Sequence, residues 1–302
     1  MKRIIPCAAV TLALMLAGSY FPLLGLIAPL PLAVLGCAEG RRITGIAELL
    51  IEATLFFMFS PSAALFFLVS CAPLSATISA VSREDFRQAK KYSGGETLAV
   101  CVGVSIVSKL VLLVVFWMLT GRNILIPDIS QADSLVVQLY ANQPELREAL
   151  VRMLALIPHI VPTLLIVWCC AETLINYMLC CRITKKLPNT PPPLPQFNQW
   201  RFSVSLLFAG VLSLLAGYFI DSEEWFAGSV FIMNLQIVLN VFMFVQGVSV
   251  AFWIMDGFKF RRMSKVIACV VLSFPFFWPW LIVIGMSDMA LNLRERIKFG
   301  AK

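Results

Sequence analysis

Long apolar stretches follow one another along almost the whole chain, and charged residues gather in the short segments between them. Most of these stretches approach or exceed the roughly 18 to 25 residues that cross the hydrocarbon core of a bilayer. Lipid offers no hydrogen bonds to the backbone, so each stretch must be helical. The pattern therefore predicts an all-α protein, a polytopic transmembrane helical bundle of about eight to nine spans.

The apolar stretches predict nine helical segments, one of them broken by proline near the N-terminus. The second segment is short for a span, and Pro29 and Pro31 should interrupt it. The basic start before the first segment resembles a signal peptide, but no clean small-x-small cleavage site precedes a soluble domain and more spans follow, so we expect an uncleaved first helix. The segments are Ile4–Phe21, Pro22–Gly36, Thr44–Ser60, Pro61–Ala80, Thr97–Thr120, Val151–Cys181, Phe202–Ile220, Trp225–Met255 and Val266–Leu293.

A proline-rich segment divides the predicted helices into two groups. Residues 183–201 contain five prolines in the run from Pro188 to Pro195, which favours an extended and stiff connector on the cytoplasmic side. We expect a six-span membrane block at 1–182 and a group of transmembrane helices at 202–302.

Basic residues indicate how the chain is oriented. Arg41 and Arg42, the loop Ser82–Glu96 and the turn after Arg182 fall on one side if each segment crosses, which the positive-inside rule assigns to the cytoplasm. We therefore expect a multi-pass membrane protein with a cytoplasmic N-terminus. The basic tail after Leu293 also belongs inside. Either the last segment, with its "FPFFWPW" run, folds back as a kinked hairpin, or a ninth helix crosses despite these charges.

Composition narrows the function classes. Hydrophobic residues make up 60% of the chain and charged residues 14%, which leaves no room for a sizeable soluble domain. The net charge of +7 lies in short loops, which attract anionic lipid headgroups, so we expect the lipid bilayer and no nucleic acid as partner. The single histidine, the absence of a Cys-x-x-Cys pair and the absence of P-loop or serine-nucleophile motifs predict no enzyme, cofactor or metal site.

Ionisable residues inside predicted spans are the candidates for a ligand or proton site, because charge is costly in the membrane. Glu48 and Glu52 lie one helical turn apart, as do Glu172 and Asn176, and Lys109 lies near the middle of its span. At 1.5 Å rise per residue, Glu52 and Glu172 fall about 12 to 14 Å from the cytoplasmic ends of their helices and Lys109 about 18 Å. They could meet at similar depth. The alternative is that Lys109 pairs with one glutamate only to hold helices together.

Polar and small residues on other helices suggest further contacts. Gln236 and Asn240 share a helix face and either bond between helices or line a substrate path. Ala9, Ala13 and Ala17 recur at intervals of four, which suits either internal packing or docking against a partner helix.

The C-terminal segment carries one more charged arrangement. Asp288 and Asn292 lie four residues apart and precede Arg294. This spacing favours a carboxylate–arginine arrangement within one helix, near the membrane interface.

The chain resembles the YybS-like family of bacterial membrane proteins in four stretches. These are "PLPLAVLG" with the following Arg41-Arg42, "LPNTPPPLPQFNQWRF", "QGVSVAFW" and "IGMSDMALNLRER". The six-span block is also similar to the S components of energy-coupling-factor vitamin transporters, which dock a transmembrane coupling subunit through an Ala-x-x-x-Ala surface on the first helix. Ala9 and Ala13 match that pattern and Ala17 extends it, whereas the extra C-terminal spans depart from a minimal S component.

Two functions follow as hypotheses. The first is a transporter-like protein that binds a small molecule in the six-span block and lacks its own ATPase, so that energy comes from a partner or an ion gradient. The second is a non-transporting scaffold or regulator that binds protein partners through the loop Ser82–Glu96 and the proline-rich linker. In that case the buried charges are structural.

Overall fold

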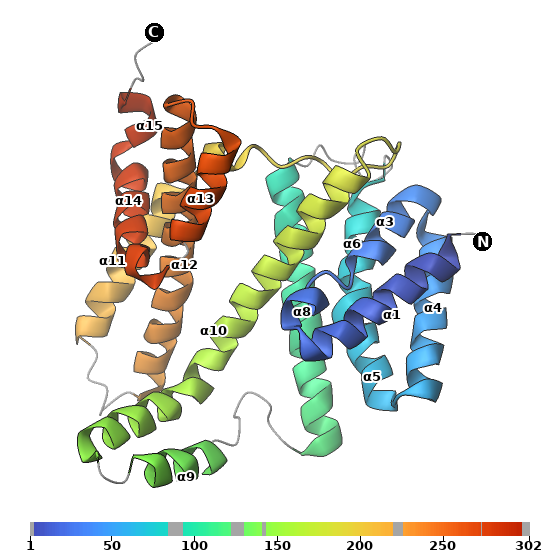
Figure 1. Cartoon of the computed structure of the whole chain (residues 1–302), viewed down its shortest axis with the longest axis horizontal. Coiled ribbons are helices and arrows are strands. Elements are labelled where there is room, and N and C mark those ends of the chain that lie inside the picture. The colour runs from blue at the N-terminus through green and yellow to red at the C-terminus, as the bar shows by residue number, and fades with distance from the viewer. Residues whose placement is uncertain are drawn as a thin grey trace. The chain divides into compact units, whose positions relative to one another are not determined.

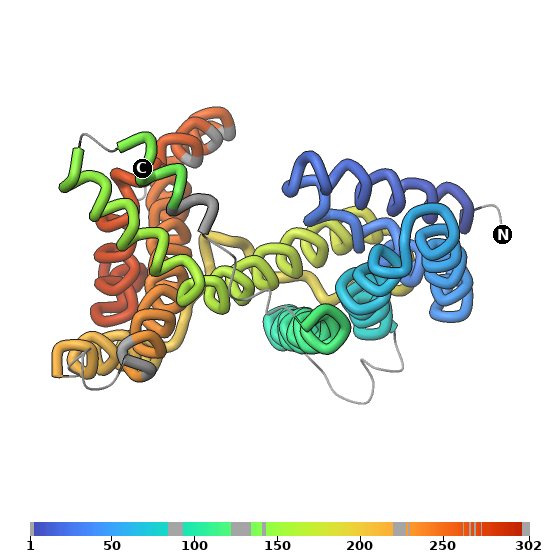
Figure 2. Tube along the Cα trace, turned by 90° about the horizontal axis from the view of Figure 1, so that it is seen from below, coloured from blue at the N-terminus to red at the C-terminus, as the bar shows by residue number. Residues whose placement is uncertain are grey.

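The structure is a computed structural model that describes residues 3–83, 93–121, 130–140, 143–219, 226–272 and 274–297. Every regular element in these residues is a helix (Figure 1), which confirms the predicted all-α class. The chain, traced in Figure 2, divides into two compact units. Unit 1 comprises Met1–Leu154 and Leu164–Leu194, and unit 2 comprises Ala155–Thr163 and Pro195–Lys302.

Several helices are long and apolar enough to cross a membrane. Five single segments qualify by length and composition, and a sixth candidate is a sharply bent pair, Met263–Leu272 with Pro275–Leu291. Two shorter apolar helices, Ile4–Tyr20 and Val204–Phe219, accompany them. The five are Pro22–Glu39, Pro61–Val81, Gly94–Thr120, Pro144–Ile183 and Val230–Gly257.

Unit 1 contains the helices from the N-terminus to α10, except for residues Ala155–Thr163 of α10, which belong to unit 2. Within it α3 packs against α1, α4 and α6, and α8 packs against α6. The helix α4 carries four charged residues and is more polar than its neighbours. The elements are α1 (Ile4–Tyr20), α2 (Pro22–Gly25), α3 (Leu30–Glu39), α4 (Arg41–Met58), α5 (Pro61–Phe66), a π-helical segment (Phe67–Cys71), α6 (Ala72–Val81), α8 (Gly94–Thr120), α9 (Ser130–Leu139) and α10 (Pro144–Ile183).

Proline sets the break that the sequence predicts in the second segment. The helix α2 ends at Gly25, a turn follows, and α3 begins with Pro29 at its N-cap position and Pro31 in its first turn. Pro lacks the backbone N–H of a helix interior, which the first turn does not need. The interruption is confirmed, and the segment continues to Glu39, three residues beyond the predicted end.

Helix ends elsewhere follow local capping chemistry. The Ser93 hydroxyl accepts from the Glu96 amide at 3.2 Å, and the Glu96 carboxylate accepts from the Ser93 amide at 2.7 Å, a capping box that starts α8. Gly121, with φ of +66°, ends that helix in the left-handed conformation. The helix α10 starts at Pro144, seven residues before the predicted Val151, because the amphipathic turns ahead of the apolar run are helical as well.

The first part of the proline-rich linker packs within unit 1. Pro191 and Pro192 are buried, and the Tyr177 hydroxyl donates to the Pro192 carbonyl at 2.6 Å. A Cβ at Gly94 would lie 2.3 Å from the Pro193 carbonyl oxygen, so α8 needs glycine at its first position. The division between the units falls within the linker, after Leu194.

Unit 2 is built around two helices in close contact, α12 and α14. A Cβ on Gly247 would lie 1.9 Å from the Leu281 carbonyl oxygen, and one on Gly285 would lie 2.0 Å from that of Met243. Glycine at both positions lets the two backbones touch. The elements are a 3₁₀ turn (Phe197–Gln199), α11 (Val204–Phe219), α12 (Phe226–Gly257), α13 (Arg262–Leu272), a second 3₁₀ turn (Pro275–Phe277), α14 (Trp278–Leu291) and α15 (Leu293–Arg296).

The segment from α13 to α15 leaves and returns at the same end of α12. Lys265 in the first turn of α13 pairs with Asp256 at the end of α12. Asn198 donates to the same carboxylate at 2.6 Å, and its carbonyl accepts from Arg294 of α15 at 2.5 Å. One linker residue therefore joins the end of α12 to α15.

The bend between α13 and α14 reaches well into the length of α12. The two helices meet at 84° around Pro275–Phe277. The Trp278 and Phe244 rings pack edge to face with centroids 5.7 Å apart. Phe244 lies thirteen residues before Gly257, or about 20 Å along the helix. Since Arg294 of α15 contacts Ser249 of α12, the last segment returns toward the end of α12 at which it began, which favours the folded-back hairpin of the two alternatives.

Candidate functional site

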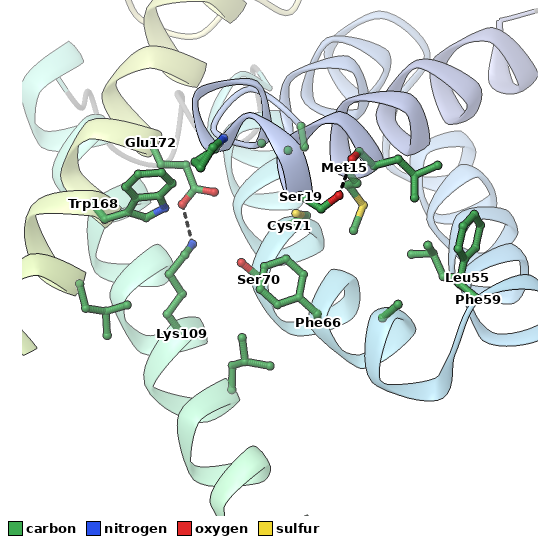
Figure 3. Close-up of a pocket in the computed structure, with 18 of the residues that line it drawn as sticks. Met15, Ser19, Leu55, Phe59, Phe66, Ser70, Cys71, Lys109, Trp168 and Glu172 are labelled. Carbon is green, nitrogen blue, oxygen red and sulfur yellow. Dashed lines mark hydrogen bonds and ion pairs between the residues drawn. The ribbon is translucent and has the colours of Figure 1, made fainter. Parts of the chain in front are cut away.

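A cavity of about 550 Å³ lies in unit 1 (Figure 3). Its lining comes from the end of α1, from α2, from the α4–α5 turn, from the π-helical segment and from the middle of α8 and α10. Most of the lining is apolar, as at Leu55, Phe59 and Trp168. Lys109 and Glu172 supply its charged groups. A ligand in this space would meet an apolar wall with polar atoms gathered in one region.

The charged groups form a buried ion pair. Lys109 Nζ lies 2.5 Å from Glu172 Oε2, and the two side chains are 8% and 5% exposed. Ser105 supports both partners, since its hydroxyl accepts from Lys109 at 3.3 Å and donates to Glu172 at 3.4 Å. Each charge thus has a partner of opposite sign and a hydrogen bond, the condition under which buried charges are tolerated.

Periodicity explains why these side chains face one another. On α8 the buried residues Thr97, Cys101, Ser105 and Lys109 recur every four positions and form one stripe. Glu172 lies on a similarly buried stripe of α10. The side chains between α8 and α10 are therefore mostly small and polar, and the ion pair lies at one end of this stripe.

Asn176 ties α10 to the proline break. Its amide nitrogen donates to the Leu26 carbonyl at 2.6 Å and to the Glu172 carbonyl at 2.7 Å. Leu26 lies in the turn between α2 and α3, where the helix break frees backbone carbonyls. Asn176 is fully buried and adjoins the ion pair without lining the cavity, so its contacts hold α10 against the broken segment.

Glu48 and Glu52 do not join this group, which corrects the expectation that all four charged side chains meet. Glu48 accepts from Ser75 at 3.0 Å. Together with Glu52 it lines a separate, open depression beside Arg41 and Arg42. The physical reason is the face of α4. Its buried stripe consists of residues such as Ile51, and the two glutamates lie beside that stripe.

The remaining candidates lie apart from the cavity. Gln236 donates to the Ser213 carbonyl at 3.2 Å and so joins α12 to α11, whereas Asn240 is exposed. On α1, Ala9 and Ala13 are exposed and Ala17 is half-buried. Their functional roles stay predictions. Most of the loop Ser82–Glu96 lies outside the described residues.

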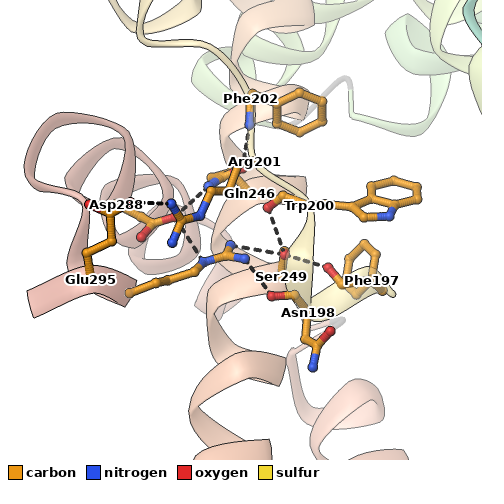
Figure 4. Close-up of polar contacts among 10 residues, drawn as sticks. Phe197, Asn198, Trp200, Arg201, Phe202, Gln246, Ser249, Asp288 and Glu295 are labelled. Carbon is orange, nitrogen blue, oxygen red and sulfur yellow. Dashed lines mark hydrogen bonds and ion pairs between the residues drawn. The ribbon is translucent and has the colours of Figure 1, made fainter. Parts of the chain in front are cut away.

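Unit 2 contains a second buried polar cluster (Figure 4). It confirms the predicted pairing of Asp288 with Arg294, whereas the contacts with Gln246, Ser249 and Asn198 were not predicted. Gln246 donates to Asp288 Oδ2 at 2.5 Å, and Arg294 Nε lies 3.2 Å from the same oxygen. Arg294 also donates to the Ser249 hydroxyl at 3.0 Å. Burial lowers the pKa of the Arg294 guanidinium, and the Asp288 carboxylate opposes that shift.

The backbone at Asn292 explains why this pair lies across a helix break. Its φ of +50° ends α14, so Arg294 lies on α15 and pairs across a helix break, which corrects the predicted arrangement within one helix. Three of the four stretches that carry the family resemblance meet in this cluster, through Asn198, Gln246 and Asp288. The fact that all three stretches carry the family resemblance was the sequence signal that could have indicated this cluster. The contacts link the linker, α12 and the C-terminal segment, and they indicate a structural role.

These features define a polytopic α-helical membrane protein. The chain belongs to the DUF2232 family of predicted membrane proteins, whose match covers residues 9–289. It is similar to the uncharacterized protein YybS of Bacillus subtilis (strain 168), with 20% identity over 147 residues, which is 48% of this chain and 47% of the relative. The match thus spans about half the length of that relative. No solved structure matches the chain, and the likeness of the six-span block to S components stays a prediction.

Proposed function

We propose that the protein binds a small, mostly apolar molecule in the unit 1 cavity and acts as a transporter-like membrane component without its own ATPase. The observation that supports this function is the cavity itself, with an apolar lining and a buried ion pair in its wall. Binding sites for small molecules typically have volumes of roughly 300 to 1,000 Å³ and a few well-placed polar groups in an apolar lining.

The cavity favours ligand binding over a purely structural role for the ion pair. A pair that only joined α8 to α10 would be most stable in a closely packed surrounding. Lys109 and Glu172 instead border open volume beside Trp168. An ionisable pair at the wall of a cavity in a membrane protein is a default functional site.

Energy for transport would come from outside this chain, because the sequence carries no P-loop. A transmembrane coupling subunit is the partner that the likeness to S components suggests. The exposed Ala9 and Ala13 on α1 provide a small-residue surface for it. We place the protein in the bacterial inner membrane with a cytoplasmic N-terminus, on the distribution of basic loops.

The proposal is tested by filling the cavity. Leu112 on α8 lines it, and Leu110 on the same helix is 48% exposed. Protein carrying Leu112→Trp or Leu110→Trp would be purified from native membranes in mild detergent and analysed by native mass spectrometry for retained small molecules. We expect a retained species in the wild type and in Leu110→Trp that is lost in Leu112→Trp. Equal retention in both variants, or none in the wild type, would count against the proposal.

A further inference from the structure

The Glu172 carboxylate uses only one of its oxygens inside the protein. Oε2 takes the contacts with Lys109 and Ser105. Among the described residues, none donates a hydrogen bond to Oε1, and Figure 3 shows this oxygen turned away from Lys109, on the side of Cys71. The residue is only 4% exposed. A carboxylate oxygen in that position is an acceptor that a bound molecule can satisfy.

The Ser70 hydroxyl is a second group on the cavity wall that is available to a ligand. Buried serines in helices of this unit usually donate to a backbone carbonyl three residues earlier, as Ser75, Ser79 and Ser108 do at 2.8–3.0 Å. Ser70 is 2% exposed and lines the cavity, yet its hydroxyl has no hydrogen-bond partner in the part of the chain that the structure describes.

The local backbone accounts for the position of Ser70. It lies in the π-helical segment Phe67–Cys71, where the wider turn displaces side chains from the α-helical register. Segments of this kind are rare and occur frequently at functional sites. Ser70 and the adjacent Cys71 both lie on the cavity wall as a result.

The charge of the cavity restricts what can bind. Lys109 and Glu172 neutralise each other, so a ligand with a net charge would bring an unpaired charge into an apolar space. An ammonium carries three N–H groups, and Lys109 directs two contacts to Glu172 and Ser105. The available polar groups are therefore one acceptor at Glu172, a donor at Lys109 and the Ser70 hydroxyl, which can do both.

We infer that the cavity takes an uncharged amphiphile, with an apolar body and a head that both donates and accepts hydrogen bonds, such as an alcohol, an amide or an N–H heterocycle. The head would donate to Glu172 Oε1 and accept from Lys109 or Ser70, and the apolar body would lie against the Leu55 and Phe59 side. This inference rests on the proposed function and adds the chemical class of the ligand.

Trp168 on the cavity wall provides a direct readout. The probes are four para-bromophenyl compounds of similar size, namely 4-bromobenzyl alcohol, 4-bromobenzamide, 4-bromobenzoate and 4-bromobenzylamine. Their bromine lies close to the head group and hence close to Trp168, which precedes Glu172 by one helical turn. Each is titrated into the protein in lipid nanodiscs, and the fluorescence quenching that disappears in Trp168→Phe measures cavity occupancy. We expect the alcohol and the amide to quench at a lower mole fraction in the membrane than the acid and the amine.

Matched serine variants test the head contact. Ser70→Ala should weaken binding of the amide roughly threefold to tenfold, the usual effect of one hydrogen bond, whereas Ser108→Ala, outside the lining, should leave it unchanged. Tightest binding of the acid or the amine would overturn the inferred class and leave the proposed function standing. Failure of every probe to give quenching that depends on Trp168 would overturn both.

Discussion

At the scale of residues, the pairing of Lys109 with Glu172 shows what depth alone predicts. Counting residues from the predicted helix ends brought these two side chains to a similar level, and they form an ion pair. Counting gave Glu52 a similar level as well, yet it lies in another depression. Depth does not specify the face of a helix. That face is set by which residues of α4 pack inward, among them Ile51 and Leu55.

The ion pair leads to a stability prediction. Lys109→Met leaves Glu172 buried without its partner, which should destabilise the protein by about 3 to 5 kcal/mol. The double variant Lys109→Met with Glu172→Gln removes both charges and should recover much of that loss. Unfolding in mixed micelles, measured for the four members of the cycle, gives the coupling energy.

Glu52→Gln is the matched control for this cycle, because Glu52 lines the open depression and not the cavity. It should change the free energy of unfolding by less than about 0.5 kcal/mol. Additive effects of the two cavity substitutions would show that the pair contributes nothing as a pair.

At the scale of elements, hydropathy located the helices well but could not show how the last segment folds. The starts and ends of the long helices follow apolar runs and capping residues, which act locally. The hairpin of α13 and α14 depends on contacts of Asn198 with Asp256 and Arg294, residues that are far apart in the sequence. The contact with Arg294 also depends on Asn292, which ends α14. The spacing of residues in the sequence did not reveal that break.

The hairpin predicts the side on which the C-terminus lies. Because α14 returns to the end of α12 that holds the linker, reporters fused after Lys302 and inserted after Arg182 should report the same side of the membrane. A reporter inserted after Phe219, at the other end of α11, should report the opposite side. Alkaline phosphatase and fluorescent-protein fusions distinguish the two. A C-terminal reporter on the same side as the Phe219 insertion would mean that the last segment crosses.

Close contact between α12 and α14 gives a packing prediction. Gly285→Ala places a Cβ within 2.0 Å of the Met243 carbonyl oxygen, so the helices must separate, and we expect a loss of about 1 to 3 kcal/mol. Gly103→Ala on α8 is the matched control, since nothing lies within 4 Å of its Cβ. That change should leave stability the same or raise it by up to about 1 kcal/mol. Thermal unfolding of both variants in one detergent makes the comparison, and equal stability would contradict the close approach.

At the scale of the whole molecule, the sequence predicted the membrane class and the family. The structure adds a cavity that no sequence motif predicted. Its lining residues come from helices spread over most of unit 1, and nearly all of them are apolar. The sequence of a membrane helix does not show whether an apolar side chain faces lipid, another helix or a cavity. Of the lining residues, only Lys109 and Glu172 were candidates from the sequence, because charged residues are rare in membrane segments.

The coupling-subunit hypothesis also belongs to this scale. If α1 docks a partner helix through its small residues, Ala9→Leu with Ala13→Leu should abolish co-purification of that partner from native membranes. Ile5→Leu, on the same helix and 73% exposed, should preserve it. Co-purification that survives the double substitution would exclude this surface as the contact, and recovery of cell-envelope or division proteins instead would favour the scaffold function.

The most direct test of a ligand in the cavity is capture in the native membrane. A photoreactive diazirine amino acid at Leu113, which lines the cavity, would be compared with the same residue at the exposed Leu110. After irradiation of intact cells, mass spectrometry of the purified protein identifies whatever is attached. We predict a distinct small molecule at position 113 and bulk phospholipid at position 110. The same phospholipids at both positions, with no other adduct at 113, would contradict a binding cavity.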